Sequence, residues 1–324
     1  MRLEPYLGRV SVRTLVQACP YPLRPLVDVD PETIVEIESY MHRPGLLLAG
    51  FRPTDEVERH VLVFGREEFL FLRRQTPETQ QAWLRLMWSC RPPLVIVGSD
   101  AEMTDAFLDG AVEYGVPVYA STSSSRAILA GGFRWLERLI VPWFRIPGNL
   151  VEIFGLGVLI TGESGIGKSE CTLDLLGRGH RLVADDAIEV ACFQDGTLIG
   201  RAPRASYGLL EIRGLGILDV RFLFGVLAVL EEKTIDLVVQ LVSAHTLGDI
   251  DRLGTEVEFY TLPHDLGSVP MIRLPVVPGR NLAALIETAV RWYMLRQRGF
   301  QVGQRLIDYC DRMARGEPSG EDPP

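Results

Sequence analysis

Short apolar runs and longer amphipathic stretches alternate through the first half of the chain, and the alternation stops near residue 130. An apolar run over residues 93–97 is followed by helical spacing over 101–114, which ends at Gly115, and by a second apolar run over 116–119. This order predicts a strand, a helix and a strand, which together form a βαβ unit. No catalytic motif lies on it, so the first half is expected to be a small α/β domain of unknown role.

A stretch rich in serine and glycine, residues 121–132, precedes an aromatic and basic segment over 133–145. Such a composition is typical of a loop or linker. We therefore expect an N-terminal domain over residues 1–132 and a second domain over 133–314. Residues 315–324 are rich in glycine, proline and acidic side chains and lack apolar anchors, which predicts a disordered tail.

The second half has a different pattern, in which short apolar runs are joined by glycine-rich turns. These runs predict strands over residues 150–154, 158–161, 181–184, 188–193 and 234–242. Later, apolar residues recur at helical spacing from Leu282 to Tyr293, between a turn at 278–281 and Gly299. This predicts an amphipathic helix with helical C-terminal structure around it, and packing against the core would be a sufficient reason for its apolar side.

Composition narrows the class of protein. Hydrophobic residues make up 47% and charged residues 23% of 324 residues, so each half can bury its own core. The longest apolar run, residues 222–230, is about half of the roughly 18 residues that a membrane span needs, and the N-terminus lacks the core of a secretory signal. Five scattered cysteines predict reduced thiols, and a net charge of −9 counts against a nucleic-acid partner. A cytoplasmic protein with neither a membrane nor a nucleic-acid partner is expected.

One motif carries specific chemistry, because it fits the pattern GxxxxGK[ST] between an apolar strand and a helix. It consists of Gly162, Glu163, Ser164, Gly165, Ile166, Gly167, Lys168 and Ser169. Its glycines let backbone N–H groups turn toward phosphate oxygens, and the helix beginning near Lys168 adds its positive end. Lys168 would place a cation on the terminal phosphates, and the Ser169 hydroxyl would bind Mg²⁺. The alternative is an ordinary glycine turn, but the flanking pattern favours a site for a nucleoside triphosphate with magnesium.

Two acidic residues, Asp185 and Asp186, follow the strand predicted over 181–184. They are therefore expected at the carboxyl end of a strand, which is where ligands bind in doubly wound sheets. One carboxylate could hold magnesium through water, while the other could accept the proton of an attacking hydroxyl. Alternation along a strand would place them on opposite faces, so they would have different roles. The pattern leaves open which one is the base, and an Asp-Asp turn without chemistry is the alternative.

Five segments occur in order along the second half: GESGIGKSE at 162–170, RGHRLVADD at 178–186, LEIRGLGI at 210–217, DRLG at 251–254 and PGRNLA at 278–283. In this order and spacing they resemble the HPr(Ser) kinase/phosphorylase family. A weaker match at residues 42–46 and 49–51 extends the resemblance over nearly the whole chain.

The resemblance implies an ATP-dependent kinase that phosphorylates a serine of HPr, a small carrier protein of the bacterial sugar phosphotransferase system. It also implies that inorganic phosphate reverses the reaction by phosphorolysis. The fold implied is α/β, with a small N-terminal α/β domain followed by a P-loop kinase domain that resembles phosphoenolpyruvate carboxykinase. The assembly implied is a homo-hexamer.

The resemblance also implies roles for single residues. Lys168 would contact the β- and γ-phosphates of ATP, and Ser169 with Glu211 would bind Mg²⁺. Asp186 would be the base, supported by Asp185. Two arginines, Arg213 and Arg252, would lie near the transferred phosphate, and the helix over 281–298 would help hold HPr. The residue pattern agrees in part, since Glu211 and Arg213 are two apart and would share one face of a strand, although this spacing by itself would favour a surface ion pair.

The chain departs from the family pattern at three positions. Pro147 stands where a histidine is usual, Glu163 where aspartate is common, and Val277 where an arginine commonly precedes PGRN. The first and last changes remove polar groups near the expected site, which puts the reverse reaction in question. Two other functions therefore stay open: a related kinase for another protein or a small alcohol, and a non-catalytic nucleotide sensor. The intact Lys168 and Asp186 argue against a sensor, which needs no base.

Overall fold

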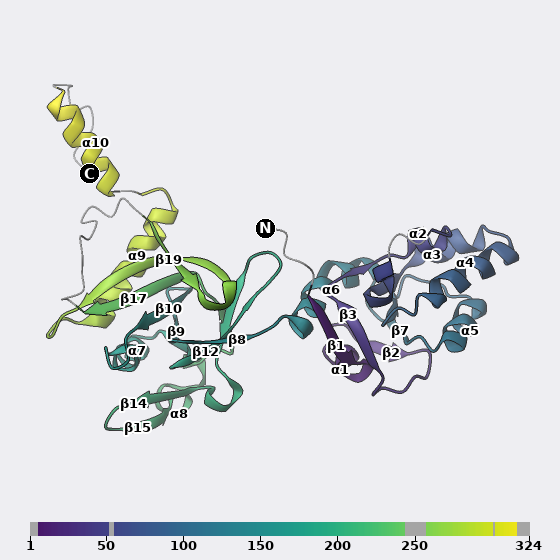
Figure 1. Cartoon of the computed structure of the whole chain (residues 1–324), viewed down its shortest axis with the longest axis horizontal. Coiled ribbons are helices and arrows are strands. Elements are labelled where there is room, and N and C mark those ends of the chain that lie inside the picture. Colours follow the sequence, from purple (N-terminus) through teal and green to yellow (C-terminus); the bar gives the residue numbers. More distant parts are fainter. Residues whose placement is uncertain (1–5, 52–54, 244–256, 301, 316–324) are drawn as a thin grey trace. The chain divides into compact units, whose positions relative to one another are not determined.

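The computed structural model describes residues 6–51, 55–243, 257–300 and 302–315, and the chain divides into two compact units, residues 1–141 and 142–324 (Figure 1). The predicted boundary at 132/133 falls inside a continuous helix, α6 (Ser125–Ile140). The serines and glycines here serve the helix. Ser124 caps it by accepting a hydrogen bond from the Ala127 N–H at 3.3 Å, and a Cβ added at Gly132 would lie 2.2 Å from the Met41 sulfur. Close packing, and not a linker, explains this composition.

The first unit is built on a five-stranded sheet in the order β2-β7-β6-β5-β4. Its parallel strands are β4 (Met41–His42), β5 (Val61–Phe64), β6 (Val95–Val97) and β7 (Val118–Ser121), and β2 (Leu23–Pro25) pairs antiparallel with β7. The predicted βαβ unit is confirmed by β6, α5 (Asp105–Tyr114) and β7. Gly115 ends α5 in a left-handed conformation, with φ of 66°.

Helices cover both faces of this sheet. One core contains buried side chains of α2 (Gly45–Leu48), α3 (Arg66–Arg73), α4 (Pro77–Ser89) and α5. The other contains side chains of α1 (Val12–Gln17), α6 and the antiparallel pair β1 (Leu7–Ser11) and β3 (Ile34–Glu38). A 3₁₀ turn, η1 (Asp55–Arg59), leads into β5.

The second unit has a six-stranded sheet in the order β11-β9-β10-β17-β19-β18. Its strands are β9 (Asn149–Ile153), β10 (Leu156–Gly162), β11 (Arg181–Ala184), β17 (Leu237–Ser243), β18 (Glu258–Leu262) and β19 (Gly267–Val276). The three strands β10, β17 and β19 run parallel, and the others pair antiparallel. Helices α7 (Lys168–Gly177) and α9 (Leu282–Gln297) pack on one face of it. The predicted helix is confirmed as α9, which Asn281 caps.

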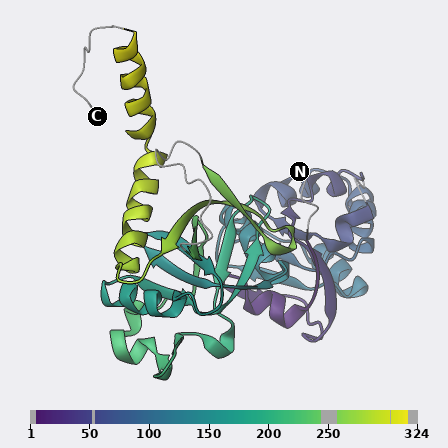
Figure 2. The same cartoon turned by 60° about the vertical axis from the view of Figure 1, so that its left-hand side comes forward.

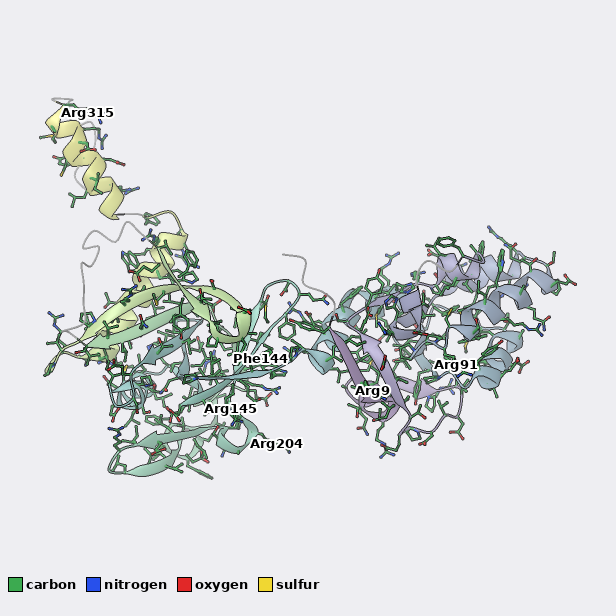
Figure 3. All side chains as sticks on the ribbon, viewed as in Figure 1. Arg9, Arg91, Phe144, Arg145, Arg204 and Arg315 are labelled. Atoms are coloured by element: carbon green, nitrogen blue, oxygen red, sulfur yellow. The ribbon has the colours of Figure 1, made fainter. Side chains whose placement is uncertain are left out.

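A four-stranded sheet packs on the other face. It has the order β16-β13-β12-β8, with β16 (Glu232–Thr234), β13 (Leu198–Arg201), β12 (Ala187–Cys192) and β8 (Phe144–Pro147). Figure 3 labels Phe144 and Arg145 on β8, and the Phe144 ring stacks on His264. The apolar run predicted as one strand over 234–242 is divided between the two sheets. The break falls at Asp236, between β16 and β17. Its carboxylate accepts a hydrogen bond from the Gly157 N–H at 2.7 Å, and this contact interrupts the strand.

Smaller elements complete the second unit. A hairpin of β14 (Leu209–Ile212) and β15 (Gly216–Asp219), with α8 (Val220–Phe224), forms a lobe apart from the two sheets (Figures 1 and 2). The remaining elements are η2 (Arg204–Ser206), η3 (Val226–Ala228), η4 (Pro263–Asp265) and α10 (Val302–Ala314). In the part of the chain described, no helix is long and apolar enough to cross a bilayer. The expected tail lies, except for Arg315, outside the described residues.

Candidate active site

The phosphate-binding loop, residues 162–169, joins the inner strand β10 to helix α7. Three of its glycines have positive φ, at 146° for Gly162, 81° for Gly165 and 107° for Gly167. At Gly162 space is also limiting, since a Cβ there would lie 2.7 Å from the Leu241 carbonyl oxygen. These conformations favour glycine and let successive N–H groups turn inward. The predicted strand, loop and helix are confirmed, and α7 begins at Lys168.

Lys168 lies over its own loop. Its Nζ donates to the carbonyl oxygens of Gly162, at 3.0 Å, and Glu163, at 3.1 Å, and its side chain is half-buried. The ammonium group is therefore held beside the inward-turned N–H groups. An anion at this position would meet both the cation and the positive end of α7.

Asp185 is the hub of the polar network next to the loop. Its Oδ1 accepts hydrogen bonds from the Asn149 amide at 2.6 Å and the Ser169 hydroxyl at 3.1 Å, and its Oδ2 accepts from the Glu211 N–H at 2.9 Å. Asp185 is 8% exposed, and this burial raises the pKa of its carboxyl, more than the three hydrogen bonds lower it. One side chain thus joins β9, α7 and β14.

Asp186 is exposed and differs in backbone and partners. Its φ is 59°, its N–H donates to the Asn149 side-chain oxygen at 3.3 Å, and its carbonyl accepts from the Gly148 N–H at 3.0 Å. Among the residues described, its carboxylate has no hydrogen-bond or ion-pair partner. The two aspartates do differ in environment, but β11 ends at Ala184, so the left-handed backbone at Asp186 separates them, and strand alternation does not.

The lobe brings two further predicted residues to the loop. The Glu211 backbone is fixed by Asp185, and its side chain is exposed. The strand β14 ends at Ile212, so Arg213 belongs to the turn. The prediction that Glu211 and Arg213 share one strand face was therefore wrong. Its guanidinium nevertheless packs against the loop, since a Cβ added at Gly165 would lie 3.1 Å from Nη1 of Arg213. Arg252 lies outside the described residues.

A cavity of about 420 Å³ opens on the other side of the loop. Its lining includes Lys168, Pro147 and the carboxyl ends of β10 and β17. Thr161 and Gln240 lie here, paired in register on these neighbouring strands. Within the described part of the chain, the hydroxyl of Thr161 is buried without a hydrogen-bond partner. Sequence reasoning missed both residues, although polar residues that close two adjacent apolar strands are a signal that could have found them.

Pro147, at the position where the resemblance led us to expect a histidine, ends the edge strand β8. It pairs with Ala187, so it lies across from the residue that follows Asp186. An edge strand tolerates proline because the missing N–H would not be needed for the sheet. Pro147 therefore borders the cavity close to the aspartate pair, and it offers no titrating group there.

Two side groups near the site serve packing. The Cys171 thiol lies within α7, and burial raises its pKa to about 12, so it is not a nucleophile. His180 meets Glu287 of α9 at 2.9 Å just before β11 begins. This contact ties α9 to the strand that leads to the aspartates, which agrees with a structural role for the histidine.

Comparison with known proteins gives consistent matches over both units. Residues 140–309 match the family described as HPr Serine kinase C-terminal domain, and residues 10–136 match HPr Serine kinase N terminus. An HPr kinase/phosphorylase of Lachnoclostridium phytofermentans is 35% identical over 87% of this chain and 90% of that protein. The HPr kinase/phosphorylase of Clostridium acetobutylicum is 39% identical over 79% of this chain and 83% of its own length.

A solved structure is also similar, the Hpr(Ser) kinase/phosphatase from Coxiella burnetii. It is 39% identical, with 48% of this chain and 93% of that chain covered and a TM-score of 0.46. The two family matches agree with the motif at 162–169. So do the relatives that are 35% and 39% identical over most of their lengths. The chain belongs to the HPr kinase/phosphorylase family.

Proposed function

We propose that this chain is an ATP-dependent protein kinase that phosphorylates a serine of HPr, or of an HPr-like protein, and that can also phosphorolyse the product. The observation that carries the proposal is the link from the loop to the aspartate pair. Asp185 binds Ser169 of the loop through Oδ1, while the neighbouring Asp186 leaves its carboxylate exposed and unpaired among the described residues. A phosphate site and an available base thus stand side by side.

The residues present fit ATP with Mg²⁺. The positive-φ glycines and Lys168 provide a concave anion site, and the Ser169 hydroxyl with the exposed Glu211 carboxylate would hold the metal ion. Among the described residues, no group of three or more His, Cys, Asp or Glu side chains is placed to hold a metal ion by itself. This suits Mg²⁺, which is commonly held by one or two protein oxygens and completed by phosphate oxygens and water. When bound, Mg-ATP would supply the phosphoryl group and offset its charge.

Asp186 is the proposed base. Its carboxylate takes the proton of the seryl hydroxyl as the seryl oxygen bonds to phosphorus and the bond to the leaving oxygen breaks. Asp185 cannot replace it, because both of its oxygens already accept hydrogen bonds, so its role is to orient Ser169 and β14. The positive charge of Arg213, beside Gly165, would stabilise the transferred phosphoryl group, and we assign the same role to Arg252.

Partner and assembly follow from the family. We propose HPr as the protein acceptor, with α9 contributing to its docking, a homo-hexamer as the working assembly, and the cytoplasm as the compartment. The free thiols among the described residues agree with a reducing environment.

The replacement of histidine by Pro147 supports a bias toward the kinase direction. In phosphorolysis the same carboxyl must be protonated and must deliver its proton to the departing seryl oxygen. An ordinary aspartic acid, with a pKa of about 3.9, is rarely protonated at neutral pH, so a neighbouring proton source would matter more in that direction. Pro147→His should therefore raise the reverse rate several-fold without raising the kinase rate. Matched rates in the parent between pH 6 and 8, with no selective gain in the variant, would contradict the bias.

The test of the whole proposal is phosphoryl transfer by the full chain. Purified protein is incubated with HPr, Mg²⁺ and ATP labelled at the γ-phosphate, and label on an HPr serine is measured. Lys168→Ala should lower transfer on the order of 10²–10³-fold without lowering the melting temperature. Lys233→Ala, on β16, is the matched control and should remain active. Absence of label on HPr, with label on another protein or a small alcohol, would replace HPr as the substrate.

A further inference from the structure

One fully buried polar side chain lies between the two aspartates of the candidate active site. Asn149 is the first residue of β9, is 0% exposed, and is followed along the strand by the buried apolar residues Leu150 and Val151. Its partner on β10, Ile160, is also apolar and buried. An apolar side chain would be less costly at such a position, because a buried amide must find hydrogen-bond partners for its polar groups. The amide of Asn149 therefore calls for a reason beyond packing.

Both polar atoms of the Asn149 side chain are paired. Its Nδ2 donates to Oδ1 of Asp185 at 2.6 Å and to the Thr172 hydroxyl at 3.0 Å, and its Oδ1 accepts from the Asp186 N–H at 3.3 Å. The Thr172 hydroxyl gives its own proton to the Lys168 carbonyl oxygen at 2.9 Å, so it can only accept from Asn149. The amide nitrogen must then face Thr172, which leaves the amide oxygen facing Asp186.

The backbone at Asp186 forms a tight turn that needs support from outside. The Ala187 N–H donates to the Asp185 carbonyl oxygen at 2.7 Å, and Asp186 between them has a φ of 59°. A three-residue turn with a positive central φ is the strained form of this turn, and it persists only where the surrounding structure holds it. Two neighbouring residues hold it here. Asn149 binds the N–H of Asp186, and the Gly148 N–H donates to its carbonyl oxygen at 3.0 Å.

The same amide also fixes the different settings of the two aspartates. Its nitrogen shares Oδ1 of Asp185 with the Ser169 hydroxyl, so the Asp185 carboxylate stays turned toward the phosphate-binding loop. Its oxygen holds the backbone of Asp186, whose carboxylate is exposed. A displacement of about 1 Å in a reacting group can lower a rate on the order of 10²-fold, so the support of this backbone bears on catalysis.

We infer that Asn149 is a positioning residue for phosphoryl transfer. Its amide oxygen holds the backbone of the base Asp186, while its amide nitrogen holds Asp185 against Ser169. The inference rests on the proposed kinase function. Because Asn149 is fully buried, it acts through the two aspartates and not by contact with a substrate.

The test measures kcat, the KM for Mg-ATP and for HPr, binding of a fluorescent ATP analogue and the melting temperature of full-length variants. Asn149→Leu removes the amide at nearly constant size. Its kcat should fall at least about ten-fold, while the KM for Mg-ATP and the affinity for the analogue stay within about three-fold. Unchanged kcat in this variant would overturn the inference. If Asn149→Leu does not fold, Asn149→Ala replaces it with the same expectations.

Thr172→Val is the matched control. Thr172 is as buried as Asn149 and binds its amide, but among the described residues it makes no hydrogen bond to either aspartate. The valine variant should have a lower melting temperature and a kcat within about three-fold of the parent. A loss of kcat equal to that of Asn149→Leu would show that Asn149 serves only the stability of the buried network, and would overturn the inference.

A double-mutant cycle tests whether Asn149 acts through the base. In the Asp186→Asn background, Asn149→Leu should lower kcat by less than about a further two-fold, because no base is left to position. Losses that multiply would overturn the action through Asp186. Asn149→Asp keeps the size and an oxygen that can accept from the Asp186 N–H, so its kcat should exceed that of Asn149→Leu. A kcat no higher than that of the leucine variant would overturn the role of the amide oxygen.

The parent enzyme separates this inference from the function on which it rests. A parent that transfers no phosphate to HPr would overturn the proposed kinase and the role of Asn149 together. An active parent whose kcat survives Asn149→Leu would overturn the role of Asn149 alone and leave the kinase in place.

Discussion

Both units contain parallel strands whose carboxyl ends carry polar side chains, but the two edges differ in how far these side chains are paired. In the first unit, Arg43 follows β4 and donates to Glu67 at 3.0 Å, to Glu68 at 3.1 Å and to the Ser125 hydroxyl at 3.0 Å. Asp100 follows β6 and accepts from the Ser125 N–H and hydroxyl, both at 2.9 Å. Every one of these groups has a partner within the unit, so the edge is closed.

The edge of the second unit is left open. The Thr161 hydroxyl is buried without a partner, the Asp186 carboxylate is exposed, and Lys168 is bound only to carbonyl oxygens of its own loop among the described residues. Both edges contain glycine, but the space beside Gly65 differs from the space beside Gly167. A Cβ at Gly65 would lie 2.3 Å from the Ser125 hydroxyl, whereas a Cβ at Gly167 would meet nothing within 4 Å. Gly65 thus closes the first edge by close packing, whereas Gly167 leaves room in the loop of the second.

The aspartates of the two edges, the exposed Asp100 and the buried Asp185, show the same contrast. Burial would raise the pKa of Asp100, but the hydrogen bonds from Ser125 outweigh it and lower that pKa. At Asp185 burial dominates and the pKa is raised. The carboxyl end of a parallel strand is therefore not sufficient for a site. A site also needs polar groups that the fold leaves unpaired, and space beside them.

The largest expected effect is at Asp186, the exposed carboxylate of the open edge. Asp186→Asn should lower phosphoryl transfer on the order of 10²–10⁴-fold, because an amide cannot take the seryl proton. Binding of a fluorescent ATP analogue should stay within about two-fold, since the loop is unchanged. Asn also tolerates the left-handed backbone, so the melting temperature should be preserved. Near-normal transfer by Asp186→Asn, with an inactive but folded Asp185→Asn, would reverse the two assignments.

The closed edge is expected to matter for stability instead. Arg43→Met leaves the buried Glu68 without its cation and should lower the free energy of unfolding by about 2 kcal/mol. Arg73→Met is the matched control in the same unit, because the Arg73–Glu102 pair is exposed and should contribute less than about 1 kcal/mol. Denaturant titrations of both variants give the comparison. Equal losses, or a loss of kinase activity by folded Arg43→Met at 25 °C, would remove the distinction between the edges.

The raised pKa of Asp185 predicts a pH dependence of stability. The folded chain keeps this proton at pH values at which the unfolded carboxyl, with a pKa of about 3.9, has lost it. The stabilisation is therefore complete below about pH 4 and is lost as pH rises through the folded pKa. The unfolding free energy of the parent relative to Asp185→Asn should fall from pH 4 to 7, by about 1.4 kcal/mol for each unit by which the two pKa values differ. A difference that stays constant or rises would show that the hydrogen bonds outweigh burial.

The smallest expected effect is at Thr161. Thr161→Val removes a buried hydroxyl that has no partner among the described residues, so the free energy of unfolding should stay equal or rise by up to about 1 kcal/mol. Thr161→Ser keeps the hydroxyl, loses a methyl group and should lower it by about 1 kcal/mol. Urea unfolding can separate the two. Destabilisation by Thr161→Val would mean that the hydroxyl is paired, and that this position of the open edge is closed after all.

Local sequence signals predicted the loop, α7, the strand before Asp185 and α9, because each is set by a motif or by periodicity within one segment. Contacts between distant segments could not be predicted in that way. The approach of Arg213 to Gly165 depends on how the hairpin folds back, and the division of residues 234–242 depends on a hydrogen bond from Gly157. The serine- and glycine-rich composition of α6 was interpreted as a linker for the same reason, because Gly132 makes room for Met41 of the distant strand β4.

The left-handed backbone at Asp186 limits which residues can occupy this position. Among L-residues, asparagine and aspartate adopt such a conformation most readily, and glycine adopts it freely. Glutamate carries the same acid but lacks that backbone tolerance, and its longer side chain would place the carboxylate elsewhere. Conformation and chemistry thus select the same side chain. In a library with all residues at position 186, folded protein should be enriched in three residues, and turnover in one.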